Sequence, residues 1–77
     1  MYAHCYRSGE IELSRKSDLS GAICIGQGQK ADLVRRVEAR ARHAHDGKTL
    51  LVPGIPEAQS NEEAEQKMIE FRAFLAQ

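Results

Sequence analysis

The sequence predicts a small α+β protein with the element order β-β-β-α-β-α. Up to residue 25, short apolar runs alternate with Ser and Gly turns, a pattern typical of strands. From residue 30 and again after residue 60, apolar residues recur every three or four positions, a pattern typical of helices. A chain of 77 residues is one domain, so we expect residues 1–77 to fold as a single unit.

The first two strands are expected at residues 2–7 and 10–14, as an antiparallel hairpin closed by Ser8-Gly9. A two-residue turn at that place pairs Tyr6 with Ile11 and His4 with Leu13. Because strand side chains alternate between faces, this register sets the composition of the core face. The predicted core face consists of Tyr2, His4, Tyr6, Ile11 and Leu13.

Residues 22–25 are apolar on both sides of the strand, as in strands covered on both faces. The first helix is expected from Lys30 to about Ala44, and Asp46-Gly47 stops it. Residues 49–52 form the last strand, which Pro53 ends. Since such a βαβ unit normally brings its strands together in parallel, we expect a mixed four-stranded sheet.

The last helix opens with a capping box at residues 60–63, in which Ser60 and Glu63 satisfy free backbone N–H groups. Its buried stripe is Ala64, Met68, Phe71 and Leu75, and we expect Val37 and Leu51 to be buried as well. With only two helices, both are expected on one face of the sheet. The other face is then partly bare, and a partner or a second copy in a homodimer would cover it.

Composition is that of an ordinary globular chain, with 42% hydrophobic residues, 29% charged residues and no net charge. A neutral chain is not built as a whole to attract polyanions. No apolar run approaches the ~20 residues of a membrane helix. Cys5 and Cys24 fall in predicted strands and no signal peptide precedes them. We therefore expect reduced thiols, a cytoplasmic location and no membrane contact.

Two loops are candidate ligand sites, Gly26–Gln29 and Pro53–Glu57. If the strands before them are parallel neighbours, both loops lie at one sheet edge, where ligands often bind. The candidate binding residues are Gln27, Gly28, Gly54 and Ile55. Gly-Gln-Gly lacks the full dinucleotide or P-loop pattern, so a plain strand-to-helix turn is the alternative.

Arginines on the first helix are the other candidate. Arg35, Arg36 and Arg40 lie off its apolar stripe, and arginines on one face can bind phosphates. The alternative is a solvated face, or one partnered by the acidic last helix. No aromatic residue accompanies the arginines as a base-stacking platform.

The histidines form no recognisable metal or catalytic motif. His43 and His45 are two apart, unlike the four-residue spacing of a zinc helix, and we interpret them and Asp46 as helix-end residues. His4 and Cys5 are strand neighbours and point to opposite faces. We therefore expect no enzymatic activity, no metal and no cofactor.

Three blocks carry a resemblance to a known family: MYAHCYRSGEIEL at the start, GAICIGQG, and ARHAHDGKTLLVPGIPEA at residues 41–58. They resemble small accessory proteins of Mu-like phages and prophages, some of which are labelled host-nuclease inhibitors. The resemblance does not include the last helix. It implies a phage accessory protein that acts in the bacterial cytoplasm by binding a host protein, with inhibition of a host nuclease or defence complex as the specific form. The alternative hypotheses are a nucleic-acid-binding accessory protein that uses the first helix, and a small-ligand binder at the two loops.

Overall fold

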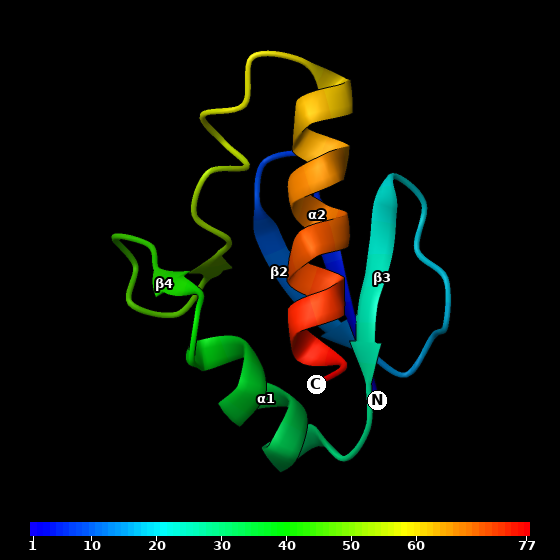
Figure 1. Cartoon of the computed structure of the whole chain (residues 1–77). Coiled ribbons are helices and arrows are strands. Elements are labelled where there is room, and N and C mark those ends of the chain that lie inside the picture. Colours follow the sequence, from blue (N-terminus) through cyan, green and yellow to red (C-terminus); the bar gives the residue numbers. More distant parts are fainter.

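The computed structural model describes residues 1–77 and confirms the α+β class (Figure 1). Five strands form one sheet, and two helices complete the fold. The elements are β1 (Tyr2–Tyr6), β2 (Glu10–Ser14), β3 (Ala22–Gln27), α1 (Lys30–Glu38), β4 (Arg42–His43), β5 (Leu50–Leu51) and α2 (Asn61–Leu75). Figure 1 shows α2 lying across one face of the sheet, with α1 near the end where α2 finishes.

The sheet has the strand order β3-β1-β2-β5-β4, and every neighbouring pair is antiparallel. The predicted parallel pair is therefore wrong, as is the predicted number of four strands. β1 and β2 separate β3 from β5, and β3 and β5 run in opposite directions. The chain after α1 passes beyond β2 rather than returning to β3, and the N–H of Val52 donates to the carbonyl of Gly9, 2.9 Å away.

The β1–β2 hairpin exists, but its predicted register is wrong by one residue. Ala3 pairs with Leu13 and Cys5 with Ile11. The turn holds three residues rather than two, because the N–H of Gly9 bonds to the carbonyl of Tyr6 (2.8 Å) with Gly9 at φ +90°. One extra turn residue moves every side chain of a strand to the opposite face.

α1 ends at Glu38, so the prediction of a helix reaching Ala44 is also wrong. The chain turns back at Asp46-Gly47 and pairs β4 with β5. The Asp46 carboxylate accepts hydrogen bonds from the N–H groups of Lys48 (2.8 Å) and Thr49 (2.9 Å), and Gly47 adopts φ +72°. Asp-Gly is a common hairpin turn as well as a helix stop. Here the hairpin overrides the helical pattern before it.

The core lies between the sheet and the helices. A Cβ atom placed on Gly26 of β3 would lie 3.3 Å from Leu33 of α1 and 3.4 Å from Leu75 of α2. Both helices therefore pack on the same face, as predicted. The core residues are Ala3, Cys5, Ile25, Leu33, Val37, Val52, Ile55, Ala64, Met68, Phe71 and Leu75. Leu51, which was predicted to be buried, is only half-buried. Its neighbour Val52 belongs to the core instead.

α2 begins as the capping box predicts. The N–H of Glu63 donates to the Ser60 hydroxyl (3.1 Å), and the Glu63 carboxylate accepts from the N–H of Gln59 (2.9 Å). The acceptor reaches one residue further back than expected. The cap places the start of α2 beside the loop after β5.

The opposite face of the sheet is closed at its centre by His4, which is fully buried. Its Nε2 lies 2.9 Å from the carbonyl of Lys16, in the loop between β2 and β3. Cys5 and Cys24 are free and lie on opposite faces of neighbouring strands. Burial raises the pKa of the Cys5 thiol to about 11. Neither helix is long and apolar enough to span a membrane.

Candidate functional site

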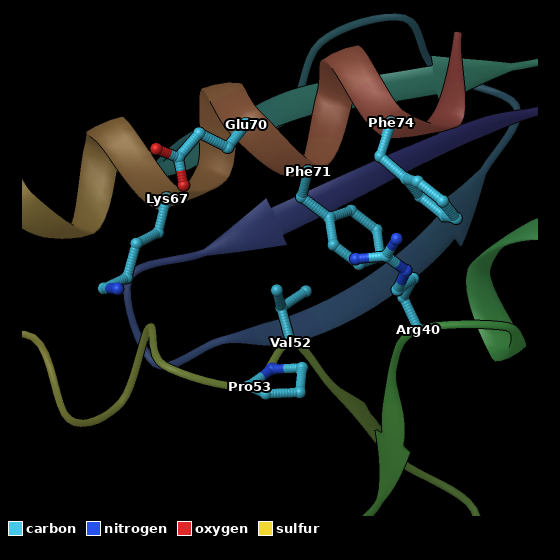
Figure 2. A pocket seen from close by; sticks show the side chains of 7 residues that line it. All are labelled: Arg40, Val52, Pro53, Lys67, Glu70, Phe71 and Phe74. Atoms are coloured by element: carbon cyan, nitrogen blue, oxygen red, sulfur yellow. The ribbon is translucent and has the colours of Figure 1, made fainter. Parts of the chain in front are cut away.

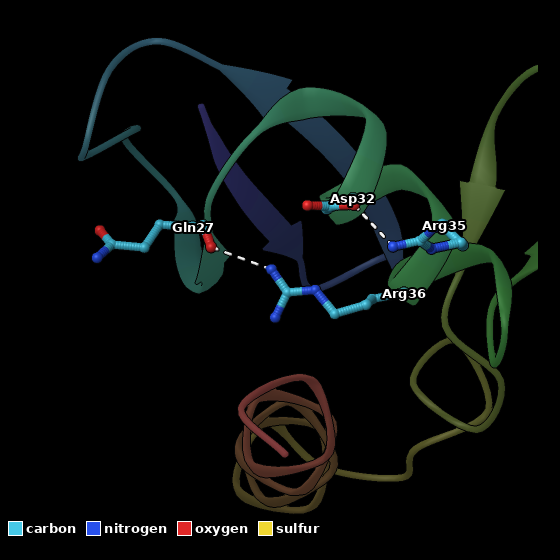
Figure 3. Close-up of polar contacts among 4 residues, drawn as sticks. All are labelled: Gln27, Asp32, Arg35 and Arg36. Atoms are coloured by element: carbon cyan, nitrogen blue, oxygen red, sulfur yellow. Dashed lines mark hydrogen bonds and ion pairs between the residues drawn. The ribbon is translucent and has the colours of Figure 1, made fainter.

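Arg36 does not project from α1 into solvent. Its guanidinium donates to the carbonyl of Leu75 at the end of α2 (2.7 Å) and to the carbonyl of Gln27 at the end of β3 (3.1 Å). Figure 3 shows the second bond, with α2 seen end-on beside it. The last carbonyls of a helix have no partner within the helix, so a cation there stabilises the helix end. Arg36 therefore ties three elements together.

The same contact accounts for the Gln27-Gly28 turn. Gly28 has φ +150°, and a Cβ atom there would lie 3.1 Å from Nη2 of Arg36. The N–H of Gly28 donates to the carbonyl of Met1 (3.0 Å). The turn thus contacts the side chain of Arg36 and the backbone of Met1.

Arg35 and Arg40 each have a different surrounding. Arg35 forms an ion pair with Asp32 one turn earlier (2.7 Å), at a fully solvated position where its side chain is 78% exposed (Figure 3). Arg40 lies beyond the end of α1, and its guanidinium stacks on the ring of Phe74, 4.2 Å from the ring centroid (Figure 2). The three arginines predicted as one basic face do not share a helix face.

The Pro53–Glu57 loop is fixed against the start of α2. Ile55 is fully buried, and its carbonyl accepts a hydrogen bond from Arg7 of the β1–β2 turn (3.0 Å). Arg7 also donates to the carbonyl of Ala58 and to the side chain of Asn61. Because this loop lies near the start of α2 and the Gln27-Gly28 turn near its end, the two loops do not form one site.

His43 lies in β4 and His45 in the turn between β4 and β5, so neither lies at a helix end. Nε2 of His43 is 3.7 Å from the carboxylate of Glu38. Hydrogen bonds from Thr49, through its hydroxyl and its N–H, lower the pKa of Asp46 to about 2, with the N–H of Lys48 contributing. No three His, Cys, Asp or Glu side chains converge where they could hold a metal ion.

The structure contains a cleft that the sequence patterns did not reveal. It lies between α2 and the Val52-Pro53 segment and has a volume of about 230 Å³ (Figure 2). Its lining residues are Arg40, Val52, Pro53, Lys67, Glu70, Phe71 and Phe74. They come from three separate segments, so no local spacing brings them together. The only sequence signal is Phe71 and Phe74, one helical turn apart on α2.

A second cleft of about 340 Å³ lies on the other side of Pro53. It is lined by the β4–β5 hairpin and the loop after it, through Arg42, His43, Ala44, His45, Leu51, Val52, Pro53, Pro56 and Glu57. The two clefts share Val52 and Pro53, so they flank one ridge. Apolar and cationic side chains line both clefts beside this Val52-Pro53 ridge.

No family model, curated protein or solved structure matches the chain.

Proposed function

We propose that this chain acts by binding another protein rather than by catalysis, and that the cleft of Figure 2 is its contact surface. The observation that supports this most strongly is the combination of an apolar floor, formed by Val52 and Phe71, with the oriented cations Arg40 and Lys67. Aromatic residues and Arg are enriched in protein interfaces, and Phe71, Phe74 and Arg40 are residues of these types.

The alternative, nucleic-acid binding by the first helix, finds less support in the contacts. Arg36 is engaged with the carbonyls of Leu75 and Gln27. Arg35 pairs with Asp32, and Arg40 keeps its hydrogen-bonding edge but lies beyond the end of α1, apart from the other two. Non-specific nucleic-acid binding comes from several phosphate contacts, and the chain has no net charge with which to supplement one.

The resemblance to Mu-like phage accessory proteins supports a more specific target. The resembling blocks form the sheet and the ridge, and α2 supplies the other wall of the cleft. In this proposal the protein works in the bacterial cytoplasm and binds a host nuclease or a defence complex. Inhibition would then follow from occupying a surface of that host protein.

Affinity capture from host lysate, with and without nuclease treatment, tests the proposal. We expect a protein partner that the wild-type chain retains after nuclease treatment. The matched control is Arg35→Gln, which removes a solvated charge outside the cleft and should retain the same partner. Loss of every partner on nuclease treatment would contradict the proposal and favour nucleic-acid binding.

A further inference from the structure

The floor of the cleft is apolar and well supported. Val52 is 3% exposed and Phe71 is 7% exposed, so both belong to the core and present only one edge to the cleft. Phe74 lies next to Phe71, with their ring centroids 6.2 Å apart. Core residues at the base of a cleft give it a fixed shape. A side chain that entered would meet rigid apolar surface.

Lys67 borders one side of this floor in a constrained position. Its side chain runs over Gly54, where a Cβ atom would lie 3.3 Å from Cδ and 3.5 Å from Nζ of Lys67. Gly54 adopts φ +89°, so the turn that receives the lysine requires glycine. Because the aliphatic part of the Lys67 side chain packs on Gly54, the positions open to its ammonium group are restricted. Figure 2 shows this group beside the cleft.

Arg40 borders the other side. Its guanidinium lies over the ring of Phe74, an arrangement that orients the planar group and leaves its edge free for hydrogen bonds. Neither Arg40 nor Lys67 has a carboxylate within 4.0 Å, and neither donates a side-chain hydrogen bond within the chain. The cleft thus has two positioned cations whose hydrogen-bonding capacity is unused.

The acidic residues nearby do not neutralise these cations. Glu70 is the only acid that lines the cleft, against two cations. Across the ridge, Glu57 already accepts a hydrogen bond from the N–H of Gly54 (3.2 Å). The second cleft is lined by Arg42 and Glu57 alike, so the excess of cations over acids belongs to the first cleft.

We infer that the cleft binds a protein segment in which an apolar side chain is flanked by carboxylates. The apolar side chain sits on Phe71 and Val52, and the carboxylates meet Lys67 and Arg40. The volume of about 230 Å³ is below the ~300–1,000 Å³ of small-molecule sites, which favours one large side chain of a segment over a whole ligand. This inference rests on the proposed function and names the chemistry of the partner.

The test is selection of a random twelve-residue peptide library on the immobilised full-length protein. Peptides that bind Arg40→Gln/Lys67→Gln equally well are removed by counter-selection. We expect the enriched peptides to carry Asp or Glu on both sides of a large apolar residue. The double substitution should weaken their binding about tenfold, as two partly exposed ion pairs would. The matched control Lys30→Gln/Arg72→Gln removes the same charge elsewhere and should leave binding unchanged.

Several results would overturn the inference: no enrichment after counter-selection, enriched peptides without acidic residues, or equal loss in the control variant. Circular dichroism of both double variants verifies that the fold is retained. The proposed function is judged separately by the lysate capture. If the variant Arg40→Gln/Lys67→Gln still captures the partner, the cleft is not the contact surface, although the proposal of protein binding stands. A wild-type chain that captures no protein would refute both.

Discussion

At the scale of single residues, two arginines connect segments that are far apart in the sequence. Arg7 joins the β1–β2 turn to Ile55, Ala58 and Asn61, and so fixes the loop that leads into α2. Arg36 does the same at the other end of α2. Sequence patterns do not distinguish such arginines from solvated ones, because their partners are distant in the sequence. For this reason Arg36 was predicted as part of a binding face.

Replacing Arg36 tests this structural role. Arg36→Ala should lower the free energy of unfolding by about 1.5–3 kcal/mol, because two carbonyls lose a charged donor. Arg35→Ala, at a solvated i,i+3 ion pair, should change it by no more than about 0.5 kcal/mol. Chemical denaturation measures both variants. Equal losses would mean that Arg36 does not cap α2.

Asp46 gives the fold a defined pH dependence. Its pKa is about 2 in the folded chain against an ordinary value of 3.8, because Thr49 and Lys48 donate hydrogen bonds to the charged form. The stabilisation is therefore fully present above about pH 4 and is lost as the pH falls through about 2. The melting temperature of the wild type should exceed that of Asp46→Asn near pH 6, and this difference should shrink towards pH 2. A difference independent of pH would contradict this explanation.

At the scale of elements, the sequence predicted which segments form strands and helices better than how they pair. The Ser60–Glu63 cap and the α2 stripe were correct because they depend on neighbouring residues. Ser8-Gly9 is compatible with a two-residue or a three-residue turn. Asp46-Gly47 is compatible with a helix stop or a hairpin turn. The choice depends on strand pairing with distant segments, and local patterns do not contain that information.

The glycine turns provide a matched test. Gly9 and Gly47 both adopt positive φ, but a Cβ atom at Gly9 would lie 2.9 Å from Pro56, whereas the space at Gly47 is open. Gly47→Ala should cost about 1–2 kcal/mol from the backbone conformation alone. Gly9→Ala should cost more, since Pro56 must also move. Thermal unfolding of both variants compares them, and the opposite order would contradict the three-residue turn.

At the scale of the whole molecule, a thin core depends on the docking of α2. Phe71 is largely buried and Phe74 only half-buried. Phe71→Ala should cost about 3–5 kcal/mol, enough to unfold much of a marginally stable domain, and Phe74→Ala should cost less. Chemical denaturation measures both variants. A loss below about 1 kcal/mol for Phe71→Ala would mean that α2 is not docked as described.

The candidate site also belongs to this scale, and this is why the sequence did not predict it. Arg40, Pro53 and Lys67 lie in three segments whose arrangement follows from the order of the strands. The prediction assumed that the strands before the two candidate loops are parallel neighbours, and it therefore placed one site at both loops. In the structure β1 and β2 lie between these strands, and the loops are separated. The residue types of the cleft were visible in the sequence, but their proximity was not.

Site-specific photocrosslinking tests most directly whether this cleft binds a protein. A benzophenone amino acid is introduced in place of Glu70, at the cleft, or in place of Lys16, in the loop on the opposite face of the sheet. After irradiation in nuclease-treated host lysate, we expect a discrete protein adduct from position 70 and none from position 16. An adduct at position 16 without one at position 70 would contradict a protein-binding role for the cleft.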